Sequence, residues 1–211
     1  MAYDLYVVTD EMLSNGLSHA EIARQAVAGG ANVIQLRDKC MSSRALFTAA
    51  LDIREITRGK ALFIVNDRVD IALASGADGV HLGQDDLPVA EARRIVPDDF
   101  VIGISVGSVE EAVAAEKGGA DYVAVSPVFS TDSKPDAGEG HGIEMIGGVR
   151  AAVSCPVLGI GGINRGNVSA LIAAGLDGAA VISAVVSAPD IAAAARDMVG
   201  IIHDAKEVRD A

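Results

Sequence analysis

The sequence predicts an α/β protein, a single (β/α)8 TIM barrel that spans residues 1–211 as one domain. Three observations support this prediction. Short runs rich in β-branched residues alternate with longer Ala-rich segments, which is typical of parallel strands joined by helices. A Gly-Ala-Asp phrase recurs before alternate strands, and polar residues gather directly after the strands. A chain of 211 residues, half of them hydrophobic, can fill one sizeable core but hardly two.

Eight strands and eight helices are predicted, at the compact end of the length range for a closed barrel. The strands are Leu5–Thr9, Val33–Arg37, Leu62–Val65, Gly79–Leu82, Val101–Ser105, Tyr122–Val125, Val157–Ile160 and Ala179–Ile182. The helices are Ser18–Ala28, Ser43–Thr57, Val69–Ala74, Val89–Val96, Val109–Lys117, Ile143–Val153, Val168–Ala174 and Ile191–Asp204.

An internal repeat indicates that the sheet closes. Four helices end in one phrase before the second, fourth, sixth and eighth strands. The phrases are Gly30-Ala31-Asn32, Gly76-Ala77-Asp78, Gly119-Ala120-Asp121 and Gly175-Leu176-Asp177. In each, the Gly can end a helix and the Asn or Asp can form a turn. Ordinary turn chemistry explains each phrase singly but not their regular placement, so the repeat is a pair of βα units, and four pairs make a barrel.

Composition limits the classes of partner. The net charge is −12 and aromatic residues make up 3% of the chain, which disfavours nucleic acid. No apolar run is long enough for a membrane span, so we expect a cytoplasmic protein with small-molecule partners and no membrane or nucleic acid. The oligomeric state is left open. Cys40 and Cys155 share no metal or redox spacing and are expected to be free thiols.

Two cations and an amide follow the second strand. Gln35, Arg37 and Lys39 occupy alternate positions, so they point to the same side of the chain. Active sites of (β/α)8 barrels lie at the C-terminal ends of the strands, where these side chains would form an anion clamp. The alternative is a surface salt-bridge cluster.

Carboxylates follow the third and fourth strands. Asp67 stands next to Asn66, and Asp86 ends the stretch from His81. Carboxylates at the tops of neighbouring strands suit Mg²⁺, which prefers oxygen ligands and completes its shell with water and phosphate. The alternative is that both aspartates cap helices. His81 is an isolated histidine, which is more often a hydrogen-bonded core or rim residue than a metal ligand.

The sixth strand is followed by the longest polar loop, and loops of this length tend to be functional or disordered. Its Thr131 and Ser133 hydroxyls, followed by Lys134, suit a phosphate or pyrophosphate. The seventh strand ends in a Gly-rich turn containing Gly162, and the eighth ends in Ile182-Ser183. Glycines allow the backbone to approach a phosphate closely, and this corner of a barrel often binds one.

Taken in order, these motifs resemble the thiamine phosphate synthase family from the first strand to the last helix. The passages that carry the resemblance are Gln35-Leu36-Arg37-Asp38-Lys39, Asn66-Asp67-Arg68-Val69-Asp70, the stretch from Gly76 to Asp86, the stretch from Ser126 to Lys134, and the stretch from Gly159 to Ile163. The family joins a hydroxymethylpyrimidine pyrophosphate to a thiazole phosphate, and it releases pyrophosphate to give thiamine phosphate.

The resemblance implies a role for each matching residue. Those that would hold the pyrimidine pyrophosphate are Gln35, Arg37, Lys39, Asn66, Ser105 and Lys134, with Leu36 and Asp38 in the same passage. Those that would hold the thiazole phosphate are Thr131, Ser133, Gly162, Ile182 and Ser183, with Asp132 beside them. Asp67 and Asp86 would bind Mg²⁺ on the diphosphate. Arg37, Lys39, Ser105 and Lys134 would assist the chemistry, in which the pyrimidine–oxygen bond breaks before the thiazole nitrogen attacks and no general base is needed.

Two positions depart from the family pattern. Ser133 stands where Thr is usual, and Gly107 stands where a His or another polar residue is common. Other functions on this barrel are a thiazole tautomerase, a non-catalytic sensor of phosphorylated ligands, and a sugar-phosphate epimerase. The tautomerase would not need Arg37, Lys39, both aspartates and Lys134 together, the sensor would tolerate loss of the aspartate pair, and the epimerase would need acid–base pairs or several histidines.

Overall fold

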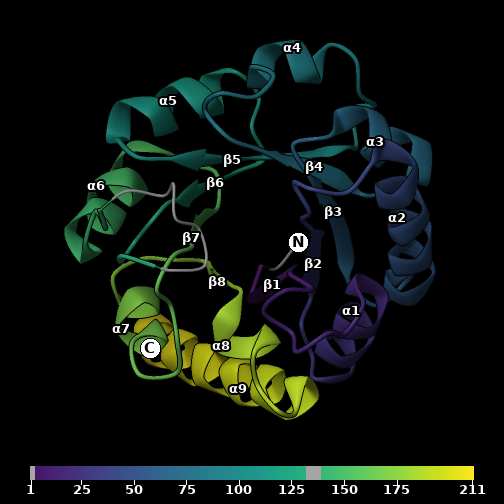
Figure 1. Cartoon of the computed structure of the whole chain (residues 1–211). Coiled ribbons are helices and arrows are strands. Elements are labelled where there is room, and N and C mark those ends of the chain that lie inside the picture. The colour runs from purple at the N-terminus through teal and green to yellow at the C-terminus, as the bar shows by residue number, and fades with distance from the viewer. Residues whose placement is uncertain (1–2, 132–138) are drawn as a thin grey trace.

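The computed structural model, which describes residues 3–131 and 139–211, contains a closed barrel of eight parallel strands in chain order (Figure 1). The pairing of β8 with β1 completes the ring. The strands are β1 (Leu5–Thr9), β2 (Val33–Leu36), β3 (Leu62–Asn66), β4 (Gly79–Leu82), β5 (Val101–Val106), β6 (Tyr122–Val125), β7 (Val157–Gly159) and β8 (Gly178–Val181). The predicted fold class is confirmed.

Helices surround the barrel on the outside (Figure 1). They are α1 (His19–Ala28), α2 (Ser43–Thr57), α3 (Val69–Ser75), α4 (Val89–Arg93), α5 (Val109–Lys117), α6 (Ile143–Ala152), α7 (Val168–Ala173), α8 (Ser183–Val186) and α9 (Ile191–Asp210). Two expectations were wrong at the ends. The fourth helix stops at Arg93 rather than Val96, because Pro97 disfavours helical backbone just before it. The last helix runs on to Asp210, and the short α8 was not predicted.

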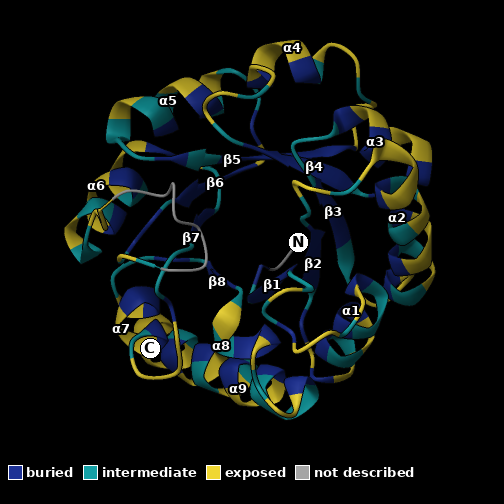
Figure 2. Cartoon of the chain, viewed as in Figure 1, coloured by how far each residue is buried: buried dark blue, intermediate teal, exposed yellow. Residues whose placement is uncertain are grey.

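Alternating side chains separate two apolar layers. Tyr6 and Val8 of β1 point into the barrel, whereas Leu5 and Val7 pack outward against the helices. Figure 2 shows the buried strands inside a ring of helices whose outer faces are exposed. Across residues 3–131 and 139–211, no helix combines the length and apolar character needed to cross a membrane.

The repeated phrase joins each odd strand to the even strand that follows it. The Asp78 carboxylate accepts a hydrogen bond from the N–H of Phe63 at 2.7 Å. It also forms an ion pair with Arg54 of α2 at 2.8 Å. Asp121 does the same for Ile102 and Arg93, and Asp177 for Val157 and Arg150. In the first pair, the Asn32 side-chain oxygen accepts the N–H of Asp4. Each repeat therefore uses one side chain to hold the N-terminal end of a strand pair.

We predict that Asp78→Ala lowers the free energy of unfolding by about 1–3 kcal/mol, because it removes the acceptor of the Phe63 N–H and the carboxylate partner of Arg54. Asp99→Ala is a matched control, since Asp99 lies at the same end of the barrel, is exposed and has no hydrogen bond within the described chain. It should change stability by less than about 0.5 kcal/mol. Urea unfolding of both variants measures the difference, and equal losses would contradict this role of the phrase.

Candidate active site

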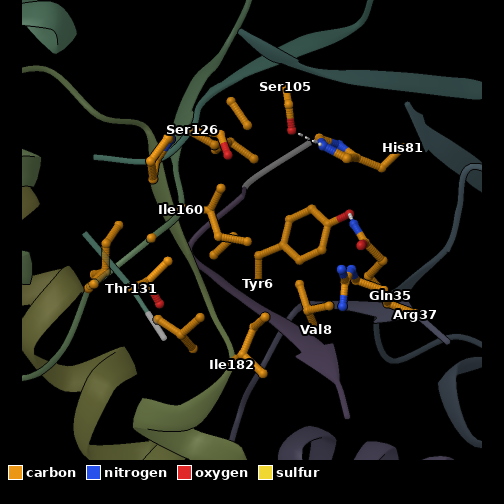
Figure 3. Close-up of a pocket in the computed structure, with 18 of the residues that line it drawn as sticks. Tyr6, Val8, Gln35, Arg37, His81, Ser105, Ser126, Thr131, Ile160 and Ile182 are labelled. Carbon is orange, nitrogen blue, oxygen red and sulfur yellow. Dashed lines mark hydrogen bonds between the residues drawn. The ribbon is translucent and has the colours of Figure 1, made fainter. Parts of the chain in front are cut away.

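A cavity of about 300 Å³ opens at the C-terminal ends of the strands (Figure 3). Its polar side chains come from nearly every strand of the barrel, because parallel strands all end at the same rim. They are Tyr6, Gln35, Arg37, Asn66, His81, Ser105, Tyr122, Ser126, Thr131, Asn164 and Ser183. Val8, Leu158, Ile160 and Ile182 add apolar wall. The cavity thus combines flat apolar surface with a polar rim, as sites for small ring compounds do.

The side chains predicted as an anion clamp lie on the cavity side of β2. Gln35 is buried, and its Nε2 donates to the Tyr6 hydroxyl at 2.7 Å. Arg37 lines the cavity, and the Lys39 Nζ lies 3.9 Å from an oxygen of Asp67 at the end of the next strand. Arg37 therefore faces the cavity, whereas Lys39 does not line it and contacts Asp67 at the rim.

Leu36 and Asp38, which belong to the same passage, have other surroundings. Leu36 is fully buried in the layer between the barrel and the helices, and it does not line the cavity. The Asp38 carboxylate accepts the N–H groups of Cys40 and Met41, each at 2.7 Å, and lies 3.4 Å from Nε2 of the buried His19. Its contacts therefore hold the loop that carries Arg37 and Lys39.

Asp67 occupies a backbone conformation that the sequence does not reveal. Its φ angle is +60°, and the Arg68 N–H donates to the Asn66 carbonyl at 2.7 Å across it, which makes a tight three-residue turn. The Asp67 N–H donates to the His81 carbonyl of β4. Such a conformation is unfavourable for most residues, and strained backbone of this kind concentrates at functional sites. The turn holds the Asp67 carboxylate beside β4.

Asp67 and Asp86 form a carboxyl pair. Burial and then hydrogen bonding to Asp86 raise the pKa of Asp67 to about 6. An oxygen of Asp86 accepts the N–H of Gly83 at 2.7 Å, which fixes that side chain toward the strand end. Neither aspartate caps a helix, because Arg68 precedes α3 and Pro88 precedes α4, and neither of these helices has a side-chain cap.

The pair offers hard oxygen ligands, and two close carboxyl groups without a cation must share a proton to avoid repulsion. These features fit Mg²⁺. Within residues 3–131 and 139–211, no three His, Cys, Asp or Glu side chains are grouped as a metal site. The described residues therefore supply two carboxylates at most in this region, and water and phosphate oxygens would suit the other positions of a Mg²⁺ shell.

The loop after β6 lies partly beyond the described residues. Ser126 and Thr131 line the cavity. The predicted ligand-binding residues Asp132, Ser133 and Lys134 fall outside the described part of the chain.

Gly162, Ile182 and Ser183 line the opposite side of the cavity, at the ends of β7 and β8. Gly162 has a φ of +64°, and a Cβ there would lie 2.7 Å from Cβ of Phe129 and 3.0 Å from the Ser130 carbonyl. Glycine is therefore required for packing against the loop after β6, and not only for the approach of a ligand. Within the described residues, no hydrogen bond of the Gly162 or Ile163 N–H groups is found, and N–H groups of this kind can bind an anion.

Gly107 lies just after β5, beside a histidine from another loop. A Cβ at this position would lie 3.2 Å from Nε2 of His141, and the Gly107 N–H donates to Glu111 at 2.7 Å. The His141 imidazole thus occupies the space next to the position where the family commonly has a polar side chain.

Sequence analysis missed Tyr6 and Tyr122 and treated His81 as isolated. The two tyrosine hydroxyls lie 3.0 Å apart in the barrel interior. His81 connects Tyr122, at 2.9 Å, to Ser105, at 3.0 Å. Alternation along the strand was the available signal for the tyrosines, because Tyr6 and Tyr122 share the inward side of their strands with the cavity residues Val8 and Ala124.

We predict a pH-dependent difference in stability between wild type and Asp67→Asn in EDTA. The pKa of Asp67 rises from 3.8 to about 6 in the folded protein, so folding favours its protonated form. Its stabilising contribution is complete below about pH 4 and is lost as the pH rises through about 6. The variant should gain on the order of 1 kcal/mol relative to wild type between these pH values, a figure reduced for partial solvent exposure. Urea unfolding at several pH values measures this, and a constant difference would contradict it.

Known proteins with similar sequences and structures confirm the resemblance seen in the motifs. The family model described as thiamine monophosphate synthase matches residues 5–185. The thiamine-phosphate synthase of Methanoculleus marisnigri is 61% identical and that of Methanoregula boonei 60%, with 98% of this chain covered in both cases and 98% and 96% of those proteins. The solved structure of thiamine phosphate pyrophosphorylase from Pyrococcus furiosus superimposes with a TM-score of 0.89 at 42% identity, over 96% of each chain. The chain belongs to the thiamine monophosphate synthase family.

Proposed function

We propose that this chain is a single-domain cytoplasmic transferase that joins hydroxymethylpyrimidine pyrophosphate to thiazole phosphate, giving thiamine phosphate and pyrophosphate. The observation that carries the proposal is that the rim of one barrel offers two separate places for phosphate, one beside the cavity and one in its wall. The Asp67–Asp86 pair, Arg37 and Lys39 lie at the ends of β2 to β4. Gly162 and Ser183 lie at the ends of β7 and β8. A reaction between two phosphorylated compounds needs both.

On the first side, Asp67 and Asp86 would hold Mg²⁺, which when bound neutralises charge on the diphosphate. Arg37 and Lys39 add positive charge from β2, and Lys39 already lies 3.9 Å from Asp67. Lys134 is proposed to act with them from the loop after β6. These groups stabilise the departing pyrophosphate, since fixed positive charge is most effective where negative charge develops.

Gln35, Asn66 and Ser105 are proposed to bind the pyrimidine ring, because all three are polar residues that line the cavity. Thr131, Ser133, Gly162, Ile182 and Ser183 are proposed to bind the thiazole phosphate. Ile160 and Ile182 supply apolar surface between the two sides. This arrangement would hold the two rings next to one another, which lowers the entropic cost of bringing them together in the transition state.

The proposed bond changes need no general base. The bond between the pyrimidine methylene carbon and the diphosphate oxygen breaks, and its electron pair leaves with pyrophosphate. The resulting cation is stabilised by the amino group of the pyrimidine, and the thiazole nitrogen donates its lone pair to form the new carbon–nitrogen bond. Positioning and charge stabilisation are the tasks left to the protein, and the cavity is equipped for both.

A tautomerase acting on thiazole phosphate alone is the competing function on this fold. It would use the end of β7 and β8 but would have no need for paired carboxylates beside two cations. The strained turn at Asp67 and its contact with Lys39 therefore favour the transferase.

We predict that the purified protein, mixed with both substrates and Mg²⁺, forms thiamine phosphate and pyrophosphate in equal amounts. Chromatography of the product and an enzymatic pyrophosphate assay measure the two yields. Omission of either substrate, or EDTA in place of Mg²⁺, should abolish both signals. Isomerisation of the thiazole phosphate without condensation would instead establish the tautomerase.

We predict that Asp67→Asn and Asp86→Asn each lower turnover by about 10²-fold or more, the scale seen when one preorganised electrostatic group is removed. Asp85→Asn is the matched control, because Asp85 adjoins Asp86, is exposed and makes no hydrogen bond within the described chain. Its turnover should stay within about twofold of wild type, and its loss of charge is identical. Initial rates across a Mg²⁺ series provide the comparison. Equal rates for all three variants would exclude the carboxyl pair as the metal site.

A further inference from the structure

Five side chains form one continuous hydrogen-bond chain through the interior of the barrel. Gln35 donates from Nε2 to the Tyr6 hydroxyl at 2.7 Å, and the Tyr6 and Tyr122 hydroxyls lie 3.0 Å apart. The Tyr122 hydroxyl is hydrogen-bonded to Nδ1 of His81 at 2.9 Å, and Nε2 of His81 is hydrogen-bonded to the Ser105 hydroxyl at 3.0 Å. Figure 3 shows Tyr6 beside Gln35 and the contact between His81 and Ser105 at the two ends of this chain.

The strands make room for this chain specifically. Gly103 of β5 lies between His81 and Tyr122 in the strand register, since it pairs with both. A Cβ at Gly103 would lie 1.9 Å from Cζ and 2.3 Å from the hydroxyl of Tyr122. Only glycine therefore lets the Tyr122 side chain cross β5 and reach His81. A glycine inside a strand weakens it, so the structure sacrifices strand stability at this position to bring these two side chains together.

The proton inventory links the two ends of the chain. Burial raises the pKa of both Tyr6 and Tyr122, so each hydroxyl keeps its single proton. If Gln35 donates to Tyr6, Tyr122 is the partner in this chain that can accept the Tyr6 proton, and Tyr122 then donates to Nδ1 of a neutral His81. His81 then carries its proton on Nε2 and donates to Ser105. The Ser105 hydroxyl remains to donate into the cavity, and the side-chain carbonyl of Gln35 remains to accept.

We propose that Tyr6, Tyr122 and His81 are positioning residues that hold Ser105 as a hydrogen-bond donor and Gln35 as an acceptor toward one ring ligand. This inference rests on the proposed function and deepens it, because a ring nitrogen next to an exocyclic amino group, as in an aminopyrimidine, is the complementary acceptor and donor. The two ends change roles only together, since a reversal at one end requires every hydroxyl and the imidazole to reverse.

The test uses variants that remove one hydroxyl each, Tyr6→Phe and Tyr122→Phe. Tyr3→Phe is the matched control. The Tyr3 ring is buried and packs 5.1 Å from the Tyr122 ring, but its hydroxyl makes no hydrogen bond within the described chain. All three changes remove one oxygen from the same tyrosine cluster, so a general effect on packing would be shared among them.

The first readout is the protonation of His81 in the ligand-free protein, measured by NMR after ¹⁵N labelling of histidine, with His81→Asn to assign the signals. Wild type and Tyr3→Phe should show one neutral form with the proton on Nε2. Tyr6→Phe should give a mixture of the Nδ1-protonated and Nε2-protonated forms of His81, although Tyr6 itself makes no contact with His81. Tyr122→Phe should give the same mixture. A mixture in wild type, or a single form in Tyr6→Phe, would overturn the proposal.

The second readout compares the change in KM for one substrate with the change in KM for the other. Loss of one link should raise KM for the pyrimidine diphosphate by about threefold to tenfold, the range expected for one hydrogen bond, and leave KM for the thiazole phosphate within about twofold. Equal changes for both substrates, or no change, would contradict the proposal. If wild type makes no thiamine phosphate, the proposed function fails. The NMR result still decides whether the hydrogen-bond chain links the donor at Gln35 to the position of the proton on His81.

Discussion

Closure of the barrel is the constraint on which the site depends. Hydrogen bonding between β8 and β1 brings the first and last strands together, so that the C-terminal ends of all eight strands form one rim. Residues far apart in the sequence, such as Arg37 and Ser183, then face a single cavity. At the opposite end, the repeated Asp or Asn side chains hold each strand pair. Stability and chemistry are thus assigned to opposite ends of the same strands.

Charge balance at the rim follows from this geometry. The chain carries a net charge of −12, and the Asp67–Asp86 pair adds two carboxyl groups where anionic ligands are proposed to bind. Arg37 and Lys39 compensate from the neighbouring strand. Burial and the contact with Asp86 raise the pKa of Asp67, since a proton reduces the repulsion within the pair. A divalent cation held together with a diphosphate would replace that proton and satisfy both carboxylates.

Much of the fold could be predicted because strand parity and turn residues are local signals. Three of the eight predicted strands match the observed ones, and the other five differ by one residue at one or both ends. Parity also placed Gln35 and Arg37 on the cavity side, whereas Lys39, which it grouped with them, contacts Asp67 and does not line the cavity. The same reasoning, applied within one motif, should have set Leu36 apart, since it alternates with Gln35 and faces the helices.

The missed features depend on contacts between distant segments. The left-handed turn at Asp67 has no signature in its own residue type, although aspartate tolerates this conformation better than most residues. The Tyr6–Tyr122 contact joins strands on different sides of the barrel, and it requires the space that Gly103 leaves. The role of Asp38 in holding its own loop became apparent only from the partners of its carboxylate.

The central claim is that two carboxylates form an incomplete metal site that the diphosphate completes. Calorimetric titration of inorganic pyrophosphate into the protein, with Mg²⁺ and then with EDTA, tests it most directly. The account predicts that pyrophosphate binds at least about tenfold more tightly with Mg²⁺ than without it, and that Asp86→Asn removes the difference. Equal affinity in Mg²⁺ and EDTA would contradict it.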